Sequence, residues 1–190
     1  MAKQVYECNW VPSRVTEDQL DDLVLIGALG SKDTIHWRAP GKECPPTPRE
    51  GEVVVFVDHL ARGFKPPGSK FYRDVLADFQ LHPQDTGPNS VTNMCHFQVL
   101  CEAFFQEEPT VELFRDLFHL NRRTEFTDGS NTELGGVAIQ KRKEVTYPHA
   151  KLHSHPKEWN QTWFYCKDTS PAGENPLPGF RPERLSNTHP

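Results

Sequence analysis

Asp85-Thr86-Gly87 is the first set of residues in this 190-residue chain whose types could do chemistry. In aspartic proteases such a tripeptide supplies half of a pair of carboxylates that share one proton. That chemistry needs the aspartate at the end of an apolar strand and a second copy of the motif. Here a polar segment, residues 82–84, precedes the tripeptide, Pro88 follows it, and the sequence has no second copy. We therefore expect a turn that leads into a helix.

Cysteine and histidine residues form two groups that could hold a metal ion. The groups are Cys95, His96 and Cys101, and His149, His153 and His155. Structural zinc sites usually pair cysteines separated by two to four residues and match them with a second pair. The five residues between Cys95 and Cys101 do not fit this pattern, and an apolar helix is a common place for buried thiols. We expect neither a metal nor another cofactor.

Two short basic runs, Arg122-Arg123 and Lys141–Lys143, are candidates for contact with nucleic acid. Basic patches of that kind usually hold about 5–8 residues, and domains that bind duplex phosphate usually carry a basic surplus. This chain instead has a net charge of −5 and a pI of about 6.0. Nucleic acid is therefore a partner that the charge does not favour.

Four aromatic residues are the candidates for a partner-binding surface: Trp159, Trp163, Phe164 and Tyr165. Aromatic side chains are common both in protein cores and at interfaces. An exposed patch would indicate binding, and a sealed cluster would indicate packing alone. The sequence contains neither a phosphate-binding loop nor the Gly-x-Ser-x-Gly motif of hydrolases. The motifs thus favour a binding protein over an enzyme.

Length and proline content indicate how many domains the chain forms and where its regular secondary structure lies. The length fits one domain of ordinary size. Of the 17 prolines, only three fall in residues 68–147, so this block should hold most of the regular structure, since proline disrupts helices and sheets. We divide the chain into an N-terminal extension of residues 1–12, a domain of residues 13–168 and a disordered, proline-rich tail of residues 169–190.

Hydrophobic spacing and capping residues predict four helices and three strands. The expected helices cover Glu17–Ile26, Lys70–Phe79, Ser90–Phe105 and Val111–Leu120, and the expected strands cover Glu52–Val57, Gly135–Lys143 and Trp163–Cys166. Thr16 with Gln19 matches a capping box, and Ser69 can cap the second helix. These elements predict an α+β domain with about four helices packed against a small three-stranded sheet.

The third expected helix, Ser90–Phe105, should contribute most to the core. Its apolar spacing predicts that Phe97, Leu100 and Phe104 are buried. Replacing a fully buried phenylalanine by alanine costs about 3–5 kcal/mol. Exposure of Phe104 would therefore show that the apolar face of this helix is assigned in the wrong phase.

The distribution of apolar residues also predicts the compartment. The longest apolar run, Val53–Val57, has five residues, whereas a membrane-spanning helix needs about 20. The first ten residues lack the apolar region of a signal peptide. We expect an intracellular protein, in the cytoplasm or nucleus, with no membrane partner and with its five cysteines reduced.

A series of short blocks follows in a characteristic order. They are Ser13–Ile26, Trp37–Pro40, Gly51–Phe56 with Arg62–Phe64, Phe71–Phe79, Pro88–Ser90, Leu100–Phe104, Leu113–Leu120, Gly135–Gln140, and Trp159 with Trp163–Tyr165. This order resembles a plant family described as a putative gypsy-type transposon, or transposase, domain. The resemblance covers residues 13–168 and implies an origin in a retrotransposon. The family has no established catalytic residues, so the resemblance assigns none here.

The resemblance and the lack of a catalytic motif favour a non-enzymatic domain that binds a protein partner or self-associates, with a gag-like or assembly role. Two alternatives stay open. A transposase- or integrase-like enzyme would need three carboxylates around two metal ions, and scattered acids nominate no such triad. A non-functional relic of the element is the other alternative.

Overall fold

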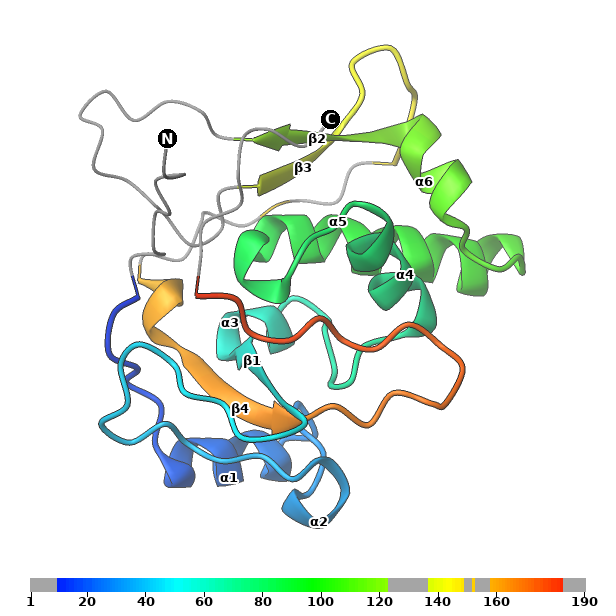
Figure 1. The fold of residues 1–190 in the computed structure, drawn as a ribbon. Coiled ribbons are helices and arrows are strands. Elements are labelled where there is room, and N and C mark those ends of the chain that lie inside the picture. Colours follow the sequence, from blue (N-terminus) through cyan, green and yellow to red (C-terminus); the bar gives the residue numbers. More distant parts are fainter. Residues whose placement is uncertain (1–9, 123–136, 149–151, 153–157, 183–190) are drawn as a thin grey trace, which may run out of the picture.

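The computed structural model describes residues 10–122, 137–148, 152 and 158–182 (Figure 1). In these residues, six α-helices combine with two separate two-stranded sheets. The mixed class of helix and sheet is confirmed, while the predicted four helices and single three-stranded sheet are not exact. No helix in the described part of the chain is both long and apolar enough to cross a membrane.

The elements follow one another in this order along the chain. The α-helices are α1 (Glu17–Leu25), α2 (Lys32–Ile35), α3 (Val57–Leu60), α4 (Lys70–Asp78), α5 (Pro88–Val99) and α6 (Val111–Leu117). The strands are β1 (Glu52–Phe56), β2 (Phe118–Arg122), β3 (Val137–Lys141) and β4 (Trp163–Lys167). Short 3-10 helices are η1 (Pro83–Asp85) and η3 (Trp159–Gln161), and η2 (Leu100–Phe105) is a π-helix.

Local signals position two of the helices as the sequence predicts. The side chain of Thr16 accepts a hydrogen bond from the Gln19 amide at 3.3 Å, and the Gln19 side chain accepts one from the Thr16 amide at 3.1 Å. This capping box begins α1, and Gly27, with a φ of +71°, follows its end. Ser69 caps α4 by accepting from the Tyr72 amide at 3.1 Å.

The first sheet joins two segments that lie far apart in the sequence. Strands β1 and β4 pair antiparallel, with Val54 opposite Tyr165. Alternate side chains of the pair enter two different apolar clusters, Val53 and Val55 on one face and Val54 and Phe56 on the other. A strand buried on both faces explains why β1 is a continuous apolar run rather than an alternating one.

The second sheet shows where the predicted fourth helix is wrong. Helix α6 ends at Leu117, and Phe118 continues in extended conformation to pair with Lys141 of β3. On its other side, β3 contacts α5: the Ser90 hydroxyl donates to the Val137 carbonyl at 3.2 Å and accepts from the Ile139 amide at 3.0 Å. Polar side chains of a helix thus occupy the edge where a third strand would pair.

The main apolar core lies between α4, α5, α6 and the two sheets (Figure 1). Its centre is a group of phenylalanine rings. The ring centroids of Phe97 and Phe114 lie 5.2 Å apart, and those of Phe114 and Phe118 lie 4.6 Å apart. Aromatic pairs at such distances add about 0.5–1.5 kcal/mol beyond the burial of their area.

The last turn of the third predicted helix departs from the expected phase. Phe97 is buried, Leu100 is half-buried, and Phe104 is 72% exposed, so the predicted burial of Phe104 is wrong. The reason is that α5 ends at Val99 and continues as the π-helix η2. A π-helix bonds each amide to the carbonyl five residues back and thus holds more residues per turn than an α-helix, which rotates Phe104 away from the core.

Residues 174–181 of the proline-rich tail are held against the domain, which corrects the predicted disorder for this segment. Leu177 is 2% exposed and belongs to the main core. Hydrogen bonds and ion pairs hold residues 174–181 against α4 and η1. The composition suggested disorder because few apolar residues occur there, but one buried leucine and several polar contacts replace them. Residues 183–190 lie outside the described residues.

Candidate functional site

The four aromatic residues predicted to bind a partner lie inside the protein. Trp163, Phe164 and Tyr165 have no exposed surface, and Trp159 is 7% exposed. Three of them form the second core cluster with Trp10, Val54 and Phe56. The indole nitrogen of Trp163 donates to the Val11 carbonyl at 2.9 Å, which ties residues 10–12 to the domain. These rings therefore pack the core around β4, and only a small part of Trp159 reaches the surface.

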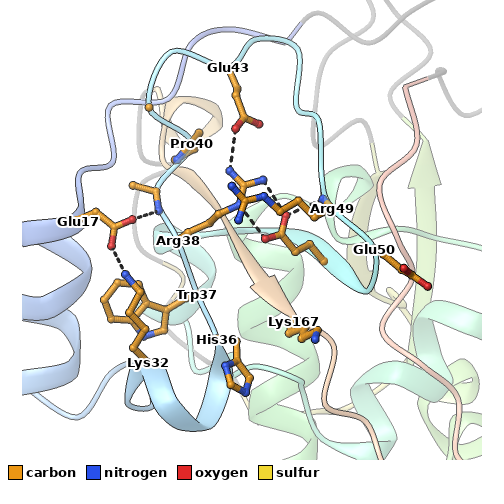
Figure 2. A pocket seen from close by; sticks show the side chains of 13 residues that line it. Glu17, Lys32, His36, Trp37, Arg38, Pro40, Glu43, Arg49, Glu50 and Lys167 are labelled. Atoms are coloured by element: carbon orange, nitrogen blue, oxygen red, sulfur yellow. Dashed lines mark hydrogen bonds and ion pairs between the residues drawn. The ribbon is translucent and has the colours of Figure 1, made fainter.

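Tyr165 contacts two residues at a polar cleft, Arg38 and Glu43, and Figure 2 shows the side chains that line this cleft. Its ring is buried, while its hydroxyl donates to Glu43 at 2.7 Å and accepts from the Thr47 amide at 2.8 Å. Burial, followed by the hydrogen bond to Glu43, raises the pKa of Tyr165 to about 12. The cleft has a volume of about 730 Å³ and is lined by residues of α1, α2 and the segment 36–52, and by Lys167.

Arg38 lies at the centre of the cleft. Its Nε and one terminal nitrogen donate to the two carboxylate oxygens of Glu52, both at 2.8 Å, and another nitrogen donates to Glu43 at 2.8 Å. The guanidinium carbon lies 3.8 Å from the centroid of the Tyr165 ring. The hydrogen bonds to Glu52 raise the pKa of Arg38. A planar guanidinium that is both bidentate and stacked is held rigidly.

Glu43 accepts hydrogen bonds from three directions. Burial alone would raise its pKa, but donors on Thr47 and Tyr165 act in the opposite direction. Together with Arg38, they lower the pKa of Glu43 to about 2. A carboxylate held ionised in this way cannot serve as a general acid or base near neutral pH.

The periphery of the cleft has groups that the network does not use. Glu17 and Lys32 pair with each other at 2.6 Å, and the side chains of Glu50 and Lys167 make no hydrogen bond or ion pair within the described residues. Arg49 belongs to the network, since its amide donates to Glu52 at 2.7 Å and its charge helps to lower the pKa of Glu52. Both His36 and Lys167 line the cleft and are labelled in Figure 2. The Arg38 network holds the loop between α2 and β1 in place. The side chains that line the cleft include both acidic and basic groups.

The Asp85-Thr86-Gly87 tripeptide forms the turn that the sequence predicts. A carboxylate oxygen of Asp85 accepts from the His82 amide at 2.8 Å, which closes the short helix η1. Its other oxygen pairs with Arg181 at 2.5 Å. Burial raises the pKa of Asp85, and the charge of Arg181 partly offsets this effect. The aspartate thus joins the turn to the tail and faces no second carboxylate of a catalytic pair in the described structure.

His59 is the most deeply buried titratable group near this turn. Its Nε2 donates to the Thr86 carbonyl at 3.1 Å, and its ring stacks on Trp159 with centroids 5.5 Å apart. Nδ1 has no hydrogen-bond partner in the described structure. Burial lowers the pKa of His59 to about 3, so the imidazole is neutral at physiological pH.

The cysteine and histidine groups do not assemble into a metal site among the residues that the structure describes. His96 contacts the Tyr147 hydroxyl at 3.3 Å. Burial raises the pKa of the Cys95 thiol to about 11 and also raises that of Cys101. Thiols with raised pKa values are poor nucleophiles near neutral pH. His149, His153 and His155 lie outside the described residues.

The basic run Lys141–Lys143 is partly used to fold its own loop. Lys141 donates to the Val145 carbonyl at 2.6 Å, and Arg142 donates to the Arg115 carbonyl at 2.9 Å. Lys143 is exposed. In the other run, the Arg122 backbone lies in β2, while the Arg122 side chain and all of Arg123 fall outside the description.

The π-helix η2 carries an exposed apolar surface that sequence analysis missed. Val99, Phe104 and Phe105 are 51%, 72% and 65% exposed, and we call these three residues the apolar tip. Val99 is the last residue of α5, and Phe104 and Phe105 are the last two residues of η2. Around the tip, residues 99–112 contain four glutamates and no lysine or arginine.

Neither the apolar tip nor the Arg38 network has a recognisable signature in the sequence. The apolar spacing of residues 90–105 fits a regular helix, and nothing in it marks the change to a π-helix. Arg38, Glu43 and Glu52 are brought together by the loop before β1, which local patterns do not predict.

Comparison with known proteins bears on the chain's origin. Residues 53–122 match the model of a family described as "Putative gypsy type transposon". The matched segment starts in β1 and ends in β2, so it contains α4, α5 and the apolar tip. No curated protein and no solved structure matches the chain. The resemblance seen in the sequence is thereby confirmed over this segment: residues 53–122 are similar to the family described as a putative gypsy type transposon.

Proposed function

We propose that this retrotransposon-derived protein is a non-enzymatic binding module that contacts a partner protein through its apolar tip. The observation that carries the proposal is the exposure of two adjacent phenylalanines, Phe104 and Phe105, on a π-helix. Single-turn π-helices are rare and occur often at functional sites. Exposed aromatic side chains that lie together mark protein interaction sites.

The charge around the tip specifies what kind of partner fits. Glu102, Glu107, Glu108 and Glu112 are exposed, and no basic residue lies among residues 99–112. Phosphate backbones and anionic membrane surfaces would be repelled by these carboxylates. The partner that complements this surface is a protein with an apolar pocket flanked by lysine or arginine side chains.

The non-enzymatic part of the proposal rests on how the reactive groups are used. Glu43 and Glu52 are bound to Arg38, Asp85 is bound to Arg181, and His59 is neutral and buried. Each of these groups stabilises a turn, a loop or the core. A general acid or base needs access to substrate and a pKa near the working pH.

The proposal is tested with two labelled helical peptides that mimic the expected and the opposite partner. One is a synthetic amphipathic helix of leucine and lysine, and the other is a helix of leucine and glutamate. Fluorescence anisotropy should show binding of the basic peptide alone, with an affinity that falls as salt rises. The double variant Phe104→Ser/Phe105→Ser should lose at least about tenfold in affinity, because hot-spot aromatics contribute about 2 kcal/mol or more.

The matched control removes an equally exposed apolar pair elsewhere. Leu25 and Ile26, at the end of α1, are 83% and 75% exposed. Leu25→Ser/Ile26→Ser should bind the basic peptide as the wild-type chain does. Equal binding by the Phe104/Phe105 variant and the wild-type chain would contradict the proposed surface. Cleavage of DNA or RNA that depends on Mg²⁺ or Mn²⁺ would contradict the non-enzymatic assignment.

A further inference from the structure

Residues 174–181 lie in extended conformation along α4 and η1, and we call this segment the strap (Figure 1, orange to red). It contains no helix or strand. Residues 68–85 supply most of the groups that hold it, and they precede it by about a hundred positions in the sequence. The contacts fall into three sets, one at each end of the strap and one in the middle.

The first set surrounds Arg73 of α4, whose side chain is only 3% exposed. One terminal nitrogen donates to the Gly68 carbonyl, and another pairs with the Glu174 carboxylate. Nε donates to the Asn175 carbonyl at 2.7 Å. Arg73 thus recognises one carboxylate and one backbone carbonyl of the strap. A buried guanidinium with its donors used in this way is a specific recognition element.

The middle of the strap is anchored by a buried side chain. Leu177 is 2% exposed and packs in the main core. Its amide donates to Asp168 at 3.2 Å, and the neighbouring Asn175 side chain donates to Asp74 at 2.8 Å. The leucine therefore provides the apolar part of the contact, while backbone and side-chain hydrogen bonds on either side set its position.

The third set of contacts binds both the backbone and the charged side chain of Arg181. The Gln84 side chain donates to the Arg181 carbonyl at 2.7 Å and accepts from the Arg181 amide at 3.1 Å. The Arg181 guanidinium pairs with Asp85 at 2.5 Å, and His82 Nδ1 donates to the Gly179 carbonyl at 2.5 Å. The side-chain amide of Gln84 thus bonds both the backbone amide and the backbone carbonyl of Arg181, as a neighbouring β-strand would do.

Together these contacts have the form of a peptide-binding groove. The groove side consists of Arg73, His82, Gln84 and Asp85, and it matches an extended segment of the pattern Glu-x-x-Leu-x-x-x-Arg. Recognition of a peptide through backbone hydrogen bonds, with pockets for chosen side chains, is a recurring mode of binding. Pro176 and Pro178 hold the strap in extended form, which reduces the entropy lost when it binds.

We propose that the groove also binds the strap of a second copy of this chain, so that two copies exchange straps and form a dimer. Residues 168–173 join β4 to the strap: Asp168 accepts from the Ser170 amide at 3.1 Å, and the Glu174 amide closes a turn by donating to the Pro171 carbonyl at 3.2 Å. Opening this turn would let the strap leave its own groove, and an exchanged strap would make the same contacts in the neighbouring copy. Such exchange is a low-cost route to dimers. The groove and the strap share no residue with the apolar tip, so the inference does not depend on the proposed function.

The ion pair between Asp85 and Arg181 allows a charge-swap test in the full chain. Asp85→Arg and Arg181→Glu each place like charges together, whether the strap is bound in its own copy or exchanged between identical copies. When the two variants are mixed, exchange gives one groove the native pair of Asp85 with Arg181. The other groove carries the substitution at position 85 and receives the strap with the substitution at position 181. These two side chains also have opposite charges, so they form an ion pair with the positive and negative partners exchanged.

Native mass spectrometry of an equimolar mixture should therefore show about a tenfold excess of heterodimer over either homodimer. The double variant Asp85→Arg/Arg181→Glu restores opposite charges within each copy. It is the matched control and should behave like wild-type protein.

A second measurement covers the case in which Asp85→Arg does not fold, since Asp85 also accepts from the His82 amide. Arg181→Glu alters the strap and leaves the groove intact. A fluorescent peptide of residues 170–182 should bind the full-length Arg181→Glu variant, and the same peptide carrying glutamate at position 181 should bind at least about tenfold more weakly. Binding of neither peptide, equal binding of both, or heterodimers that form regardless of charge matching would each overturn the proposal.

Discussion

Phe97 and Phe104 lie seven residues apart on one continuous helical segment, yet they are 1% and 72% exposed. In a regular α-helix, residues at this spacing share a face. The π-helix that follows Val99 breaks the repeat, so that one phenylalanine enters the core and the other points to solvent. The same change of helix type both completes the core and creates the apolar tip.

Alanine substitutions should separate these two phenylalanines. Phe97→Ala should lower the free energy of unfolding by about 3–5 kcal/mol, because it leaves a cavity among Phe71, Phe114 and Phe118. Phe104→Ala should change it by no more than about 0.5 kcal/mol, as substitutions at exposed positions usually do. Urea unfolding followed by tryptophan fluorescence measures both. Equal costs for the two variants would contradict the assigned helix phase.

Arg38 should be necessary for stability although it lies beside a cleft. Its side chain is 14% exposed, and that of Glu52 is 9% exposed. Arg38→Met keeps most of the apolar stem but removes the hydrogen bonds to the partly exposed carboxylates of Glu43 and Glu52, which should cost about 1.5–3 kcal/mol. The control is Arg14→Met, which breaks the exposed pair with Glu158 and should cost about 0–1 kcal/mol. A neutral Arg38→Met would refute the role of this network.

Acid should destabilise the protein through His59. Its pKa is about 3 in the folded state and has an ordinary value of 6.5 in the unfolded chain. Below pH 6.5 the unfolded state therefore binds a proton that the folded state excludes, and stability falls as pH decreases toward 3. The contribution approaches about 1.4 kcal/mol per pH unit.

A variant isolates this effect from that of the carboxylates. His59→Gln keeps an N–H donor for the Thr86 carbonyl and cannot gain a proton. Glu43, with a pKa lowered from 4.5 to about 2, also favours the folded state, but its contribution disappears only as pH falls below 4.5. Between pH 6.5 and 4.5, the unfolding free energy of His59→Gln should thus depend less on pH than that of the wild-type chain. Parallel pH dependences would show that His59 titrates normally.

Ser90 should couple α5 to the second sheet. Its hydroxyl bonds both the Val137 carbonyl and the Ile139 amide, and the residue is buried. Ser90→Ala leaves these two backbone groups without a partner and should cost about 1–3 kcal/mol. Amide hydrogen exchange should show faster exchange at Ile139, whereas amides of β1 should keep their protection. Unchanged exchange at Ile139 would contradict this coupling.

Elements that depend on neighbouring residues could be predicted from the sequence. The capping box of Thr16 and Gln19 and the Ser69 cap are local contacts, and they position α1 and α4 as expected. The apolar run at β1 also predicts its strand, since such a run is typical of a strand buried on both faces.

Elements that depend on distant partners could not be predicted in the same way. Residues 118–120 continue a helical apolar pattern, yet they pair with β3. The tail has the composition of a disordered segment, yet Arg73 and Asp85 bind it at both ends. The aromatic residues around Trp163 are compatible in the sequence with either an exposed patch or a buried cluster. They are buried because β1 pairs with β4 and packs Val54 and Phe56 against them.

The most direct test of the binding surface is to map where the leucine–lysine peptide contacts the ¹⁵N-labelled protein by NMR. The apolar tip predicts that amide shifts change at the end of α5, in η2 and in the following residues up to Glu112, and that they change little at Leu25 and Ile26. Changes centred instead on the Arg38 cleft, the strap or the end of α1 would contradict the account.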